Sequence, residues 1–118
     1  MLDKHLELRD RTKQFALRIL KLCNSLPKSE AARTIHRQLL RSGTSVAANY
    51  RAVGRAQSQA EFVAKMGVVV EEADESVFWL ELLVEGGIMP KARLEDPITE
   101  ANELVSIFVA SQKTARGR

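Results

Sequence analysis

The stretch SQAEFVAKMGVVVEEADESVFWLELLVEGG, residues 58–87, decides the fold of this chain. It opens with Ser58, and Glu61 follows three residues later, which is the spacing of a capping box at the start of a helix. Apolar residues then recur every three or four positions until Gly86-Gly87 ends the pattern. The stretch therefore predicts one long helix over residues 58–85. Its core-facing stripe consists of Phe62, Met66, Val69, Ala73, Val77, Leu80 and Val84.

The same periodicity predicts three further helices, over residues 4–24, 29–53 and 97–113. Ser29 is a suitable N-cap, and Pro97 is tolerated in a first turn. Gly43 is expected to stay helical, because small residues there permit close approach of a neighbouring helix. Short connections predict an all-α fold, an antiparallel up-down-up-down four-helix bundle. We expect a single domain over residues 1–118, with a frayed tail at residues 113–118.

Composition narrows the class of protein. The chain has 118 residues, 45% of them apolar, enough for one hydrophobic core. The single cysteine, Cys23, is interpreted as a small buried hydrophobe. No apolar run approaches the roughly 20 residues that span a bilayer, and the N-terminus does not resemble a signal peptide. A cytoplasmic location is therefore expected.

Charge is distributed unevenly along the chain. Residues 1–55 hold 12 Lys/Arg and 4 Asp/Glu, whereas residues 56–103 hold 3 Lys/Arg and 11 Asp/Glu. Residues 104–118 add three basic residues and bring the net charge to +3. Such asymmetry suggests either a basic face for a polyanion or complementary surfaces that meet each other.

Arginines follow one face of the helix predicted over residues 29–53. At about 100° per residue, five of them fall within an arc of roughly 80°, opposite the apolar face. The arginine fork suits phosphate, but no aromatic residue interleaves, so contacts to a nucleic-acid backbone are expected rather than base stacking. The alternative is a solvated face or ion pairs within the bundle. The predicted nucleic-acid-binding residues are Arg33, Arg37, Arg41, Arg51 and Arg55, with Arg11 and Arg18 of the first helix.

A second surface is predicted on the helix over residues 58–85. Phe78, Trp79 and Leu82 lie outside its core stripe, on the arc that also holds Glu71 and Glu75. Exposed apolar patches usually mark interfaces, so these five residues predict an oligomer interface. The alternative is that a wide bundle covers them. Acidic and basic faces could also meet head to tail in a ring, in which case some arginines are structural.

The sequence contains little evidence of a catalytic or metal site. The pairs Glu71-Glu72 and Asp74-Glu75 lack the Glu-x-x-His spacing of di-iron bundles. His36 stands between Arg33 and Arg37, which disfavours a bound cation. We therefore predict that the protein is not an enzyme and has no metal or other cofactor.

Several segments resemble a known family: residues 26–30, 38–49, 61–62 and 71–76. Their most specific block is Arg41-Ser42-Gly43-Thr44-Ser45-Val46-Ala47-Ala48-Asn49. Together they resemble the four-helix-bundle family of 23S rRNA intervening-sequence proteins, over roughly residues 8–112. The accessory variability determinant of diversity-generating retroelements is a relative of that family.

The resemblance implies an antiparallel bundle and a homopentameric ring. Through the retroelement relative, it also implies a basic surface that binds RNA and a reverse transcriptase. Family members usually continue the asparagine with Ile-Ala-Glu-Gly, but here Tyr50-Arg51-Ala52-Val53 follows Asn49. The family glutamate is therefore missing, while Arg51 adds positive charge. Asn49 itself is expected to be a structural polar group that fixes helix register through a buried hydrogen bond.

Two hypotheses follow. The first is a homo-oligomeric protein that binds nucleic acid, with structured RNA favoured over DNA, through the arginine stripe. The second is a protein-interaction scaffold whose charged faces serve self-assembly or the docking of a partner such as a reverse transcriptase.

Overall fold

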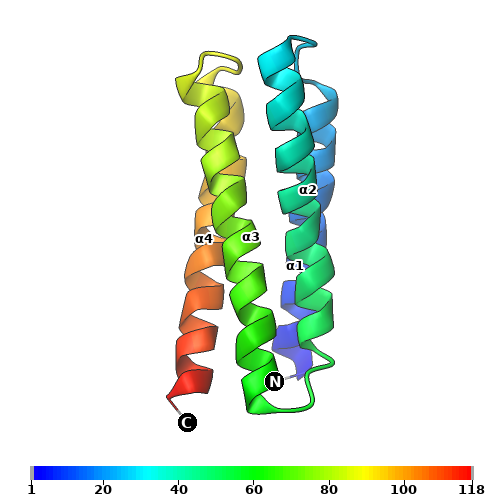
Figure 1. Cartoon of the computed structure of the whole chain (residues 1–118), viewed down its shortest axis with the longest axis vertical. Coiled ribbons are helices and arrows are strands. Elements are labelled where there is room, and N and C mark those ends of the chain that lie inside the picture. Colours follow the sequence, from blue (N-terminus) through cyan, green and yellow to red (C-terminus); the bar gives the residue numbers. More distant parts are fainter. Residues whose placement is uncertain (1, 118) are drawn as a thin grey trace.

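A computed structural model describes residues 2–117 of the chain and shows four antiparallel α-helices (Figure 1). These are α1 (Leu2–Asn24), α2 (Glu30–Val53), α3 (Gln59–Glu85) and α4 (Lys91–Arg116). Both chain ends lie at the same end of the bundle. The predicted all-α four-helix bundle is confirmed. Within the described residues, no helix is both long and apolar enough to cross a membrane.

Serine side chains start α2 and α3 as predicted. The Ser29 hydroxyl accepts a hydrogen bond from the Ala32 amide, and the Ser58 hydroxyl accepts one from the Glu61 amide. These bonds satisfy amides that have no partner inside the helix. The Glu61 carboxylate in turn accepts from the backbone amide of Gln57, at 3.3 Å. Local sequence therefore determines where both helices begin.

Two glycines end α3 in a Schellman motif. Gly86 is still right-handed, whereas Gly87 has φ +72°, a conformation that a side chain disfavours. The Ile88 amide donates to the Leu83 carbonyl, and the Gly87 amide donates to the Val84 carbonyl. This is the bonding pattern of the motif. The chain can thus turn sharply into the short connection to α4.

The predicted bounds of α4 were wrong at both ends. The helix begins at Lys91 rather than Pro97, because burial of Leu94 and Pro97 offsets the backbone bond that the proline cannot make. It also continues through the residues expected to fray, as far as Arg116. Gln59 of α3 donates a hydrogen bond to the Ala115 carbonyl and so ties this end to the bundle. Arg118 lies outside the described residues.

One apolar core runs along the bundle. Helices α2 and α3 each pack extensively against two neighbours, whereas α1 and α4 contact each other only sparsely. The predicted stripe of α3 faces this core, although Phe62 and Val84 are only partly buried and Leu83 is buried in addition. The largest fully buried side chains include Phe15, Ile19, Leu39, Met66, Leu80, Leu94, Leu104 and Phe108.

Candidate nucleic-acid interface

The block Arg41–Asn49 lies in the middle of α2, where α1 and α3 flank it. Gly43 is buried, and a Cβ atom there would lie 2.8 Å from Cγ2 of Ile19 in α1. Only a residue without a side chain leaves room for this approach. The expected role of Gly43 in close helix packing is confirmed. This packing explains why a glycine, which disfavours a helix, stands in the middle of α2.

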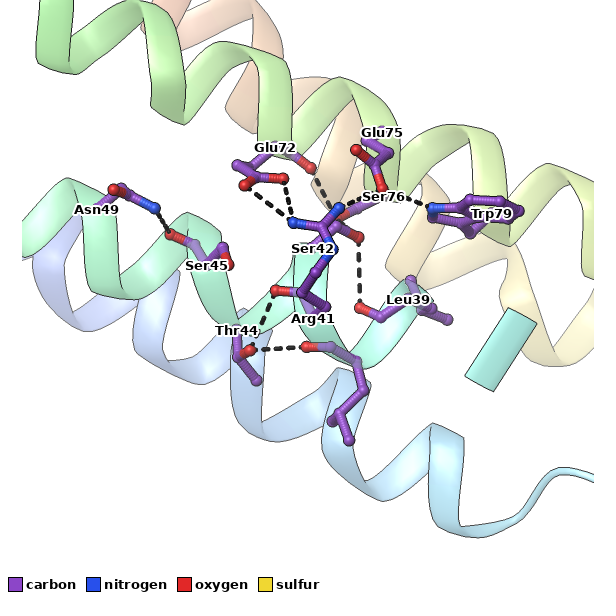
Figure 2. Close-up of polar contacts among 11 residues, drawn as sticks. Leu39, Arg41, Ser42, Thr44, Ser45, Asn49, Glu72, Glu75, Ser76 and Trp79 are labelled. Atoms are coloured by element: carbon purple, nitrogen blue, oxygen red, sulfur yellow. Dashed lines mark hydrogen bonds and ion pairs between the residues drawn. The ribbon is translucent and has the colours of Figure 1, made fainter. Parts of the chain in front are cut away.

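On the side of α2 that faces α3, a hydrogen bond joins the two helices next to Gly43. The hydroxyl groups of Ser42 and Ser76 are fully buried and hydrogen-bond at 2.9 Å (Figure 2). Ser42 donates toward the Leu39 carbonyl, and the single proton of Ser76 goes either to Ser42 or to the Glu72 carbonyl, so both hydroxyls are satisfied. A buried polar pair of this kind favours one register between two helices, because a slip would break the bond between the hydroxyls.

That role had been predicted for Asn49, and the prediction was wrong. Its side-chain amide donates to the Ser45 carbonyl at 2.9 Å, one turn earlier in α2 (Figure 2). The side chain is only partly buried, and its bond stays within its own helix. Such a bond cannot set the register between helices. The serine pair does so instead, because its members come from α2 and α3.

Arg41 reaches across to α3 rather than outward. Its guanidinium donates to Glu72 at 3.1 Å and also to Glu75, and the Trp79 indole donates to the same Glu75 carboxylate at 2.9 Å (Figure 2). The indole and Arg41 bonds hold the pKa of Glu75 below its usual value. Two residues expected at an oligomer interface, Glu75 and Trp79, thus belong to an intrachain network with an arginine expected to bind nucleic acid.

The two arginines predicted on the first helix point toward α4. Arg11 donates twice to Glu100, at 2.8 Å each, and once to Glu103. These bonds raise the pKa of Arg11 and lower that of Glu100. Arg18 lies 3.9 Å from Asp96, a looser pair. Arg11, Arg18 and Arg41 therefore form ion pairs within the bundle, which was the alternative to binding nucleic acid.

Four predicted arginines lie on the outward side of α2: Arg33, Arg37 and Arg51 within the helix, and Arg55 two residues beyond its end. All four are exposed, and the ion pairs among residues 2–117 include none of them. Arg33, Arg37 and Arg51 keep the arrangement that the helical wheel predicted, with Arg41 at its edge. This face is therefore the one that a polyanion can reach.

A groove between α1 and α2 extends this basic face. Its volume is about 670 Å³, and Arg51 and Arg55 line it together with Arg9 and Lys13 from α1. The sequence analysis missed these two α1 residues. Their spacing of four marks a shared helix face, but only the packing shows that this face adjoins the arginines of α2.

The outer face of α3 carries the other predicted surface. Phe78 is 50% exposed, and its ring meets that of Trp79 edge to face at 4.9 Å. Leu82 is partly buried, and Glu71 is exposed. On α1, Leu6, Leu17 and Leu20 are exposed as well. The bundle thus covers Trp79 and Leu82 in part but leaves Phe78 open, and whether this face joins subunits remains a prediction.

Nucleophilic and metal-binding groups do not gather at any of these surfaces. Cys23 is buried as predicted, and burial raises the pKa of its thiol to about 11, so the thiol stays protonated at neutral pH. In the part of the chain that the structure describes, no three His, Cys, Asp or Glu side chains are placed to hold a metal ion.

Comparison with known proteins relates this arrangement to one family. A family model described as 23S rRNA-intervening sequence protein matches residues 4–110. The bundle is also similar to a crystal structure from Bacteroides thetaiotaomicron, of a protein with unknown function from the S23 ribosomal protein family. The two chains are 32% identical with a TM-score of 0.85, and the match covers 93% of this chain and 98% of the other. No curated protein matches this chain.

Proposed function

This chain belongs to the 23S rRNA-intervening sequence protein family, and from that premise we propose a function for it. It is a non-enzymatic, homo-oligomeric protein of the cytoplasm that binds structured RNA through the outward arginines of α2. The observation that carries this proposal is the separation of the predicted arginines into two groups. Three are paired with carboxylates of their own chain, whereas Arg33, Arg37, Arg51 and Arg55 stay on an exposed face.

The proposed contacts are made to the RNA backbone. Arginine donates two hydrogen bonds in one plane, which matches the geometry of phosphate. Tyr50, the one aromatic residue of α2, is 4% exposed and stacks between His5 and Phe108. It is therefore unable to stack on a base. Binding of this kind depends on RNA shape and salt and has little sequence preference.

Replacement of the four outward arginines tests the proposal. We expect the quadruple variant Arg33→Gln, Arg37→Gln, Arg51→Gln and Arg55→Gln to lose binding to a fluorescent hairpin RNA, measured by anisotropy over a range of salt. The control is Arg41→Gln on the same helix. Because Arg41 is paired with Glu72 and Glu75, this variant should bind RNA like the wild type and lose some stability. Wild type that fails to bind at low salt, or a quadruple variant that still binds, contradicts the proposal.

A second candidate function is that of an assembly scaffold, with the charged faces serving self-association or the docking of a partner. The exposed ring of Phe78 and the exposed leucines of α1 favour it, since both are apolar surfaces on different helices. Contact between unlike faces forms a ring when the rotation between subunits closes, and the family resemblance suggests five subunits. The relationship to diversity-generating retroelements makes a reverse transcriptase one candidate partner.

Analytical ultracentrifugation distinguishes the candidates. The scaffold predicts a wild-type oligomer that dissociates on Phe78→Asp and on Arg51→Glu, without RNA binding at any salt concentration. Thr99→Asp on α4 is the control, because Thr99 is also exposed but is not one of the exposed apolar residues. A monomeric wild type argues against both candidates, since both include self-association.

A further inference from the structure

The basic groove between α1 and α2 lies toward the end of the bundle that carries both chain termini (Figure 1). Arg9 and Lys13 are one turn of α1 apart on one wall, about 6 Å along the axis. Arg51 lies near the end of α2, and Arg55 lies two residues beyond that end, on the other wall. Both walls of the groove therefore carry two cations.

Small side chains line the middle of this groove. Thr44, Ala47 and Ala48 contribute to its lining, so a ligand can approach the backbone of α2 closely. The Thr44 hydroxyl donates to the Leu40 carbonyl at 2.7 Å, which leaves its oxygen to accept. The groove is thus an open channel with cationic walls, and its lining contains no aromatic ring.

Positive charge is concentrated at this end of the molecule. Residues 2–13, 47–70 and 106–117 form this half of the bundle and hold nine Lys/Arg against four Asp/Glu. The other half, residues 14–46 and 71–105, holds eight against eleven. Within the groove lining, Asp10 is the single carboxylate beside four cations. A concave, positively charged surface focuses the field and attracts anions more strongly than a flat one.

We infer that this groove holds the phosphodiester backbone of the bound RNA, an inference that rests on the function proposed above. Arg9, Lys13, Arg51 and Arg55 contact the phosphates. Arg33 and Arg37 lie further along α2, about 20 Å from the Arg51–Arg55 pair by helical rise, and outside the groove lining. They extend the basic face beyond the groove. The groove therefore uses one half of the arginine stripe and adds two cations from α1.

Two double variants that remove the same charge test this assignment. Lys13→Gln with Arg51→Gln removes one cation from each wall, and Lys21→Gln with Lys28→Gln, at two exposed cations outside both the groove and the arginine face, is the matched control. For a hairpin RNA probe, we expect the groove variant to weaken binding at least tenfold near physiological salt. We also expect the slope of log affinity against log salt to fall by about 2. The control should retain that slope, with at most a threefold loss.

Other results would distinguish a failure of the groove assignment from a failure of the proposed function. If Arg33→Gln with Arg37→Gln loses the salt slope and the groove variant retains it, RNA binding stands and the groove assignment is overturned. If the wild type binds no RNA, both fail. If the groove variant dissociates the oligomer and leaves RNA affinity unchanged, the groove is a subunit contact, and the assignment is again overturned. Circular dichroism of each variant confirms that it folds.

Discussion

At the scale of single residues, the start of the block Arg41–Asn49 is used for packing. Gly43 admits Ile19 of α1, Ser42 bonds to Ser76 of α3, and Arg41 pairs with two glutamates. These three consecutive residues hold α2 against both of its neighbours. In this chain, these residues of the block therefore act in helix packing.

Replacement of Gly43 by alanine measures this packing. Alanine favours a helix over glycine by about 1 kcal/mol, but its Cβ would overlap Ile19, and overpacking costs about 1–3 kcal/mol. We expect Gly43→Ala to lower the free energy of unfolding in urea. Gly67→Ala is the control, since its Cβ would meet a single side-chain atom, Nε2 of Gln112, at 3.0 Å. Equal effects of the two substitutions would argue against a tight contact at Gly43.

The Arg11–Glu100 pair predicts a dependence of stability on pH. Hydrogen bonds from Arg11 lower the pKa of Glu100 in the folded chain below its usual 4.5. The stabilisation is therefore complete above about pH 5 and is lost as pH falls through the folded pKa. Glu100→Gln should cost about 1 kcal/mol at pH 7 and progressively less as pH falls through the folded pKa, by urea unfolding. A difference that does not shrink with falling pH would assign the loss to packing instead.

At the scale of helices, local sequence explains where α2 and α3 begin and where α3 ends, because caps act over three or four residues. Ser29, Ser58 and the Gly86-Gly87 pair all lie where predicted. The bounds of α4 were not predictable in this way. Burial of Leu94 and contact of Gln59 with Ala115 extend this helix, and both depend on other helices.

The cap of α3 can be tested directly. Ser58→Ala removes the acceptor of the Glu61 amide and should lower the free energy of unfolding by about 1 kcal/mol. Ser106→Ala, at an exposed position within α4, should have no such cost, because alanine favours a helix. Thermal unfolding followed by circular dichroism measures both. A Ser58→Ala variant as stable as the wild type would show that the helix start is determined by packing.

At the scale of the whole molecule, the four helices differ in how extensively they pack against their neighbours. Helices α2 and α3 each pack against two neighbours, while α1 and α4 meet sparsely and are joined by the ion pairs of Arg11 and Arg18. The α1–α4 side therefore depends more on charge than the rest of the bundle. Salt screens such partly exposed pairs but not the apolar core.

Native-state hydrogen exchange should reveal this difference. We expect amides of α1 and α4 to exchange through partial opening, and the centres of α2 and α3 to exchange only on global unfolding. Raising the salt concentration to about 1 M should widen the difference, because it screens the pairs of Arg11. Uniform protection across all helices, unchanged by salt, would indicate a single cooperative unit.

The sequence by itself determined the helical class, the caps and the outward face of α2, since these depend on spacing along one helix. It could not decide which arginines form ion pairs within the chain. A helical wheel gives the direction of a side chain but does not show which residues of the neighbouring helix lie there. Only the packing paired Arg41 with α3 and brought Arg9 and Lys13 beside Arg51 and Arg55. The stretch of residues 58–87 thus predicts a helix of the bundle, and the packing of α1 against α2 forms the basic groove.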